Sequence, residues 1–164
     1  MQRKNIILIS LILAILIIFC YIFHYYSGNF ARKKIAKLTD NWIDAVVKEQ
    51  SPEKIAKLFC KNAELVGTVS QIIRRNEDIK LYFDYFAKLP NISVLEKEYN
   101  IMKIDPNTYM NTAYILWNWD GLEKPIMARM TFIFEIGWNS CLIYLHSSAL
   151  PDLNENLYKI SGKK

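Results

Sequence analysis

The chain has 164 residues, a length that fits one globular domain, and 52% of them are hydrophobic. Its formal net charge of +5 is concentrated near the N-terminus, where six basic residues between Arg3 and Lys37 precede the first acidic residue, Asp40. From Asp40 onward, 15 basic residues stand against 16 acidic ones, for a net charge of −1. This distribution excludes a cationic nucleic-acid-binding protein, and the 13% aromatic content argues against intrinsic disorder.

An uncharged apolar run extends from Ile6 to Tyr26. As a helix, its 21 residues would be about 30 Å long, which is the thickness of the hydrocarbon core of a bilayer. A cleavable signal peptide is the competing interpretation, but the run is longer than a usual signal core and is followed by bulky aromatic residues where signal peptidase requires small ones. The pattern therefore predicts an uncleaved single-pass membrane anchor within residues 1–28, followed by a domain over 29–152 and a tail over 153–164.

The orientation of this anchor depends on the basic residues at its two ends. Arg3, Lys4 and the terminal amine precede the run, and four basic residues follow it, so the two counts nearly cancel. Anchors with such short N-terminal tails usually behave as unprocessed signals. We therefore expect the tail in the cytoplasm and the domain on the translocated side, periplasmic or extracellular.

The cysteine pattern gives no sign of a metal centre. Cys60 and Cys141 would pair in an oxidising compartment or stay as buried thiols, and the second interpretation is the simpler one. No C-x-x-C motif and no Cys/His spacing of a metal site occurs in the sequence. We expect neither a metal nor a cofactor.

Helical patterns occupy the first half of the domain. Apolar residues recur at intervals of three, four and seven from Phe30 to about Gln50 and predict one long amphipathic helix. Ser51 followed by Pro52 is typical of a helix start, so a short helix is expected from there to about Cys60.

A brief strand over residues 63–68 is expected before the third helix. Asn76 is a candidate N-cap, and Glu77 and Asp78 behind it suit the positive end of the helix dipole. Apolar side chains then continue at helical spacing to about Lys88.

From Ile92 the apolar pattern changes to a period of two, which is typical of strands. Turn residues divide this region at 105–107, 120–121 and 137–140. Four consecutive antiparallel strands are predicted over residues 92–104, 108–119, 125–136 and 141–149. The fold class is therefore α+β, with a curved sheet that wraps a long helix, and a parallel doubly wound fold is disfavoured.

Three segments of the sequence, Ile79–Phe86, Ala128–Glu135 and Ile143–Pro151, together with this order of elements, resemble the NTF2-like superfamily. The last segment is similar to the closing strand of the branch that holds SnoaL-like proteins and the association domain of calmodulin-dependent kinase. The resemblance covers residues 35–152. It implies a cone-shaped fold that encloses a pocket, with homodimers formed through the exposed sheet face.

The chain departs from that branch in its last strand. Cys141 stands where the branch usually has a tryptophan, and Tyr144 and Leu145 replace two of its histidines, so that His146 alone remains. The branch contains isomerases, cyclases and dehydratases as well as binding and assembly modules. Fold alone does not choose among them.

Two residues of the last strands are candidates for contact with a ligand. Alternation separates Arg129 from the apolar face of its strand. We expect its charge to meet a carboxylate, either Glu98 or Asp120 in a structural ion pair or a ligand's, with a solvated position as the remaining alternative. His146 alternates with Leu142, Tyr144 and Ser148, and serves either as an acid/base group or as a satisfied histidine at a dimer interface.

The aromatic candidates are Trp42, Tyr82 and Trp117, with Trp119 on the same face as Trp117. They are pocket walls in one interpretation and core or dimer surface in the other. Asp120 and Asp105 are acidic candidates for proton abstraction, but both fall at predicted turns, where solvated residues are common.

Three hypotheses of function remain. The favoured one is a membrane-anchored, homodimeric module that binds a small apolar or anionic ligand, or a protein partner, without catalysis. The second is a SnoaL-like isomerase or dehydratase that uses His146 or an acidic residue to move a proton, with Arg129 holding an anionic group. The third, from layout alone, is an assembly factor similar to the VirB8-like proteins of type IV secretion.

Overall fold

The computed structural model describes residues 2–68 and 72–149, without the side chains of residues 2–11 and 20–27. The expected tail over 153–164 lies outside this range. The chain divides into two compact units with the boundary after Lys34, and helix α1 (Gln2–Val47) contributes to both. Each unit is therefore described by itself.

The predicted anchor lies within α1. In the part of the chain that the structure describes, no helix combines the length and the hydropathy needed to cross a membrane. The structure does not describe all the side chains of the run from Ile6 to Tyr26.

The helices of the second unit follow the predicted order. The final part of α1, from Ile35 to Val47, is followed by α2 (Pro52–Lys57) and α3 (Glu77–Phe86). Ser51 caps α2 as predicted, because its hydroxyl accepts a hydrogen bond from the Lys54 backbone N–H at 3.3 Å. The helix nevertheless ends three residues before the expected Cys60, since the chain enters a strand at Phe59.

Asn76 occupies the position before α3 but does not cap it in the expected way. Its φ of 50° and ψ of −122° lie outside the usual N-cap region, and its side chain makes no capping hydrogen bond. Glu77 and Asp78 still lie in the first turn of α3, where their negative charges interact favourably with the helix dipole.

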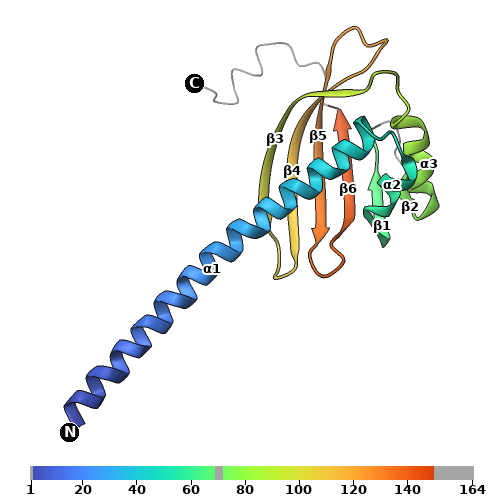
Figure 1. Cartoon of the computed structure of the whole chain (residues 1–164). Helices are drawn as coiled ribbons and strands as arrows, with labels where there is room; N and C mark the ends of the chain where they lie inside the picture. The colour runs from blue at the N-terminus through green and yellow to red at the C-terminus, as the bar shows by residue number, and fades with distance from the viewer. Residues whose placement is uncertain (1, 69–71, 150–164) are drawn as a thin grey trace. The chain divides into compact units, whose positions relative to one another are not determined.

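The sheet contains six strands among the described residues and follows the order β2-β1-β6-β5-β4-β3 (Figure 1). The four predicted consecutive strands are confirmed to within one residue at each end. The short β2 was not predicted, because three residues are too few to show an alternating pattern. The strands are β1 (Phe59–Val66), β2 (Ile73–Arg75), β3 (Ser93–Lys103), β4 (Thr108–Asn118), β5 (Ile126–Glu135) and β6 (Cys141–Ala149).

The sheet is mixed rather than wholly antiparallel. Strands β3 to β6 form the predicted meander, while β1 pairs in parallel with β6, with Leu65 opposite Leu145. The α+β prediction is thus confirmed, with β1 and β2 as an extension of the sheet beyond the meander.

Alternation along the strands gives the sheet two distinct faces. The inner face is buried under the Ile35–Val47 part of α1 and under α3, and it carries alternate residues such as Ala113, Ile115 and Phe132. Figure 1 shows α1 passing across this face of the curved sheet. The outer face carries the intervening residues, which are half-buried or exposed.

Polar contacts also attach α1 to the sheet. Thr39 and Asn111 are both fully buried, and the Asn111 amide donates to the Thr39 hydroxyl at 2.9 Å. Nearer the surface, the Tyr99 hydroxyl donates to Asp40 at 2.6 Å, and Lys97 forms an ion pair with the same carboxylate. Burial raises the pKa of Asp40, but hydrogen bonds from Lys97 and Tyr99 outweigh it and leave the pKa below its ordinary value.

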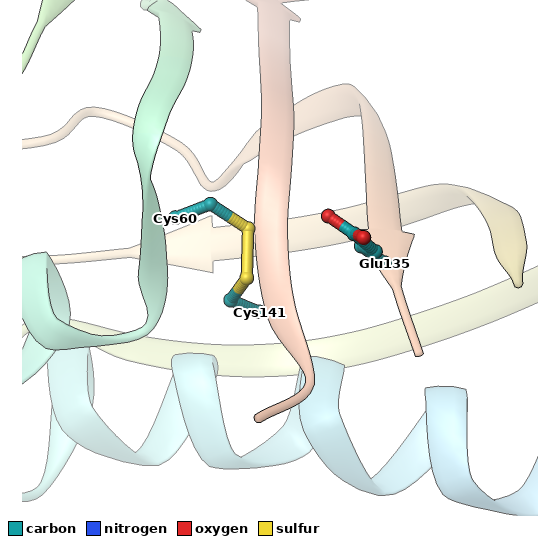
Figure 2. Close-up of side chains that lie close together, drawn as sticks. All are labelled: Cys60, Glu135 and Cys141. Atoms are coloured by element: carbon teal, nitrogen blue, oxygen red, sulfur yellow. A yellow bond between two sulfur atoms is a disulfide. The ribbon is translucent and has the colours of Figure 1, made fainter. Parts of the chain in front are cut away.

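A disulfide joins Cys60 on β1 to Cys141 on β6, across 5.2 Å between Cα atoms (Figure 2). The simpler interpretation of two buried thiols is therefore wrong. The pairing depends on the parallel contact between β1 and β6, which no local pattern in the sequence announces. The bond connects residues 81 positions apart and closes most of the domain into one loop.

Removing this disulfide should lower the free energy of unfolding by about 2–4 kcal/mol, because the unfolded chain regains the entropy of a long loop. The variant is Cys60→Ser combined with Cys141→Ser in the full chain, compared with the unaltered chain by urea unfolding. A reductant should destabilise the unaltered chain by the same amount and leave the variant unchanged. Equal stability of the unaltered chain and the variant, each with and without reductant, would contradict the cross-link.

Candidate functional site

A cavity of about 200 Å³ lies between the inner face of the sheet, α3 and the last turns of α1. Helix α3 supplies one wall, and β4, β5 and β6 supply the other. Trp42 is the contribution of α1, and Thr68 follows the end of β1. The lining residues are Trp42, Leu65, Thr68, Tyr82, Phe83, Tyr85, Phe86, Leu89, Trp117, Trp119, Ile126, Ala128, Met130, Leu145, Ser147 and Ala149.

Aromatic rings form much of this lining and contact one another edge to face. The Trp42 ring lies 5.8 Å from that of Phe83 and 6.2 Å from that of Trp117, measured between centroids. Phe86 meets Trp117 at 5.4 Å and stacks with Tyr82 at 6.0 Å. Such contacts stabilise a rigid apolar wall suited to flat ring compounds.

Trp42 lines the cavity and is almost fully buried. Its side chain is 1% exposed, and Nε1 is enclosed without a hydrogen-bond acceptor among the described residues. The Asn111 Oδ1 atom is likewise buried without a donor in that part of the chain. Unpaired buried groups of this kind cost about 1–3 kcal/mol each, which the surrounding aromatic packing must offset.

The described lining carries no charged side chain: it contains no Asp, Glu, Lys, Arg or His. Its ionisable groups are the phenols of Tyr82 and Tyr85. Burial raises the pKa of Tyr82, and the Arg74 charge and a hydrogen bond with the Thr68 backbone oppose that rise only in part. Tyr82 therefore stays protonated and neutral at physiological pH.

Polar atoms gather at one corner of the cavity. The Thr68 and Ser147 hydroxyls are hydrogen-bonded to each other at 2.8 Å, and Tyr82 lines the same cavity with its hydroxyl against Gly67, the residue before Thr68. We call this group of Thr68, Tyr82 and Ser147 the hydroxyl corner. The remaining lining is dominated by aromatic and aliphatic carbon.

Three of the five residues predicted to contact a ligand line the cavity: Trp42, Tyr82 and Trp117. Arg129 and His146 do not. Both belong to the outer face, since their neighbours Ala128, Met130 and Leu145 are the ones that point inward.

The expectation that Arg129 is buried against a carboxylate is wrong. Its side chain is exposed, and it forms no ion pair with Glu98 or Asp120, both of which are described. In the sheet it lies between Tyr114 on β4 and Ser148 on β6. A solvated position on the outer face removes the need for a partner.

His146 shares the outer face with Tyr144 and Ser148, as predicted, but not with Leu142. The register between β5 and β6 shifts after Ile133, so that Leu142 turns inward and is fully buried. An irregularity of this kind reverses the phase of alternation, and it is invisible in the sequence.

The two acidic candidates are exposed turn residues outside the cavity. The Asp105 carboxylate accepts hydrogen bonds from the backbone N–H groups of Asn107 and Thr108, at 2.9 and 2.8 Å, and these bonds hold its pKa below the ordinary value. Asp120 accepts a hydrogen bond from the Asn91 amide at 2.6 Å. Both therefore stabilise turns.

Glu135 lies next to Cys60 and Cys141, and ligand atoms of the three residues fall within 4.8 Å of one another. Figure 2 shows the two sulfur atoms bonded to each other, with the Glu135 carboxylate beside them. Metal ions bind the thiolate form of cysteine, which a disulfide does not offer. The group therefore carries no metal site in this state.

Sequence reasoning missed the polar members of the cavity lining. Neither Ser147 nor Thr68 was predicted to contact a ligand. Their shared position depends on the parallel pairing of β1 with β6. Ser147 alternates with the buried Leu145, and that was the one signal that could have indicated its inward position.

Known structures share this arrangement of helices and sheet. No protein-family model matches the sequence, and no curated protein does so either. An NTF2-like protein of unknown function from Pseudomonas putida superposes with a TM-score of 0.66 at 13% identity, over 77% of this chain and 97% of that one. The chain therefore has an NTF2-like fold, and the predicted resemblance is confirmed at the level of the fold.

Two further structures carry functional descriptions. One, from Xanthomonas campestris, is provisionally described as a calcium/calmodulin-dependent protein kinase II association domain; it has a TM-score of 0.63 and 26% identity over 73% of this chain and 88% of that one. The other, from Parabacteroides distasonis, is provisionally described as a ketosteroid isomerase; it has a TM-score of 0.55 and 13% identity over 73% and 88%. Structures with these two different descriptions thus share the fold.

Proposed function

We propose that this domain is a binding module that holds a small, neutral, largely apolar ring compound in the cavity and does not transform it. The observation that carries this proposal is the lining itself, which is aromatic and aliphatic and, among the described residues, free of charged side chains. Apolar clefts with a few polar groups are the usual form of small-molecule sites.

The absence of charge from the described lining favours a neutral ligand over an anionic one. A carboxylate moved into this cavity would lose its hydration without meeting a cationic side chain of the described lining, at a cost of several kcal/mol. Arg129, the cation expected to hold an anion, lies on the outer face. Of the two ligand classes predicted from the sequence, the apolar one is therefore preferred.

The volume sets the size of the ligand. A cavity of about 150 Å³ is enough for benzene. At about 200 Å³, with an opening toward solvent, this cavity suits one or two fused rings.

A catalytic role has less support. General acid/base catalysis needs a titrating group within hydrogen-bond reach of the substrate. His146, Asp105 and Asp120 all lie outside the cavity, and Tyr82 is held in its neutral form. The isomerase alternative therefore lacks a group to abstract a proton in the described part of the site.

Filling the cavity should abolish binding without harming the fold. Ala128 is 4% exposed and lines the cavity, so Ala128→Leu places additional carbon where the ligand would lie. Naphthalene binding, followed by quenching of tryptophan fluorescence, should weaken roughly tenfold or more, and urea unfolding should show no loss of stability.

The matched control is Thr131→Leu, a similar enlargement on the outer face of the same strand, which should leave naphthalene binding unchanged. In the unaltered chain, 2-naphthoate should bind about a hundredfold more weakly than naphthalene, because its charge must be desolvated. Tighter binding of the anion, or unchanged binding in Ala128→Leu, would contradict the proposal.

We further propose that the domain forms homodimers through its outer sheet face. This face mixes apolar, hydroxyl and charged side chains, and Glu98, Tyr114 and Arg129 follow one another across three strands. A face that carries both signs of charge is able to complement a two-fold copy of itself.

Placing a charge at the centre of this face should separate the dimer. Thr131 lies between Thr112 and His146, so Thr131→Arg would bring two like charges together at a two-fold interface. Sedimentation equilibrium should give twice the chain mass for the unaltered protein and one chain mass for the variant. Leu81→Arg, at an exposed position of α3, is the control that should remain dimeric. A monomeric unaltered chain would refute the dimer.

The disulfide supports a location for the domain in an oxidising compartment, periplasmic or extracellular, since such bonds are rare where thiols are kept reduced. Attachment to a membrane through residues 6–26 stays a prediction.

A further inference from the structure

We propose that the hydroxyl corner of Thr68, Tyr82 and Ser147 binds a single oxygen atom of the ligand, so that the cavity selects neutral ring compounds that carry one hydroxyl or carbonyl group. This inference rests on the proposed function, because it assigns the polar end of the same ligand.

Thr68 connects the members of the corner. Its hydroxyl contacts the Ser147 hydroxyl at 2.8 Å, and the residue before it, Gly67, lies against the Tyr82 hydroxyl. Three oxygen atoms from three separate elements thus converge on one side of an apolar cavity.

These bonds leave hydrogen-bonding capacity for a ligand. The Tyr82 proton has no acceptor among the described residues and is available to a ligand in the cavity. One of the two protons of the Thr68 and Ser147 pair is used in their mutual bond, and the other can point elsewhere. The corner therefore offers donors to a carbonyl, and both donors and acceptors to a hydroxyl.

The position of Tyr82 is fixed by the residue before Thr68. A Cβ atom at Gly67 would lie 2.4 Å from Tyr82 Cε2 and 2.7 Å from its hydroxyl oxygen, far inside contact distance. The phenol thus lies directly against the Gly67 backbone. A side chain at position 67 would force the ring of Tyr82 away and open the corner.

The rest of the lining explains why a single oxygen is expected. Away from the corner, the walls contacted by a ring are carbon from residues such as Phe86, Trp117 and Met130. A second polar group on the ligand would be buried there without a partner, which is unfavourable. The corner thus determines orientation, and the aromatic walls provide most of the affinity.

The test compares naphthalene with 2-naphthol at pH 7, well below the pKa near 10 of a phenol, so that both probes are neutral. In the unaltered full chain, 2-naphthol should bind about three- to tenfold more tightly, the gain of one hydrogen bond. In the triple variant Thr68→Val, Tyr82→Phe and Ser147→Ala, which removes every hydroxyl of the corner, the two affinities should become equal, with naphthalene binding retained. Quenching of tryptophan fluorescence reports both, since Trp42, Trp117 and Trp119 line the cavity.

Two further variants test whether the position of the hydroxyl groups matters, rather than only their presence in the cavity. Tyr85→Phe removes a hydroxyl from the same helix and the same cavity, but outside the corner, and should keep the preference for 2-naphthol. Gly67→Ala keeps every hydroxyl but displaces Tyr82, and should reduce the preference. Circular dichroism of each variant identifies any that fails to fold. The folded variants then show whether the preference for 2-naphthol depends on the hydroxyl corner.

The outcomes separate the two proposals. If neither probe binds the unaltered chain, both proposals fail. If naphthalene and 2-naphthol bind equally well, or if the preference survives loss of the Thr68, Tyr82 and Ser147 hydroxyls, the ligand-binding proposal stands and the hydroxyl corner is overturned.

Discussion

The contacts of a single buried ring, that of Trp42, join the layers on which the cavity depends. Its indole meets Phe83 on α3, Trp117 on β4 and Phe132 on β5, at centroid distances of 5.8, 6.2 and 5.2 Å. Edge-to-face packing of this kind holds α1 and α3 at a fixed separation over the sheet, and the space left between their side chains is the cavity. The apolar character of the site follows from the same contacts, because the residues that support the fold also line the pocket.

Because side chains alternate along the strands, the apolar residues and the ionisable residues of the sheet lie on opposite faces. Carbon-rich side chains of β4, β5 and β6 point inward to the cavity, while Arg129, Tyr144 and His146 point outward. The residues best suited to ionic or acid/base chemistry are thereby kept away from the ligand. This division underlies both proposals: a neutral ligand in the cavity on one face of the sheet, and contact with a second copy through the other face.

Local patterns were sufficient to predict much of this fold. The four consecutive strands and the Ser51 cap of α2 follow from periodicity and turn residues. The pairing of β1 with β6 is a long-range event with no local signature, so the disulfide and the hydroxyl corner could not be predicted. The shift of register in β6 likewise has no local pattern in the sequence. For this reason Leu142 was predicted on the wrong face.

The measurement that tests this account most directly is native mass spectrometry of the full chain, purified gently from its own cells. A neutral ring compound with a hydroxyl or carbonyl group, retained in the native protein and released on denaturation, is the predicted result. It would show that the cavity is a binding site for the class of molecule its lining indicates. A retained anion, or a compound without rings, would contradict the assignment of the cavity.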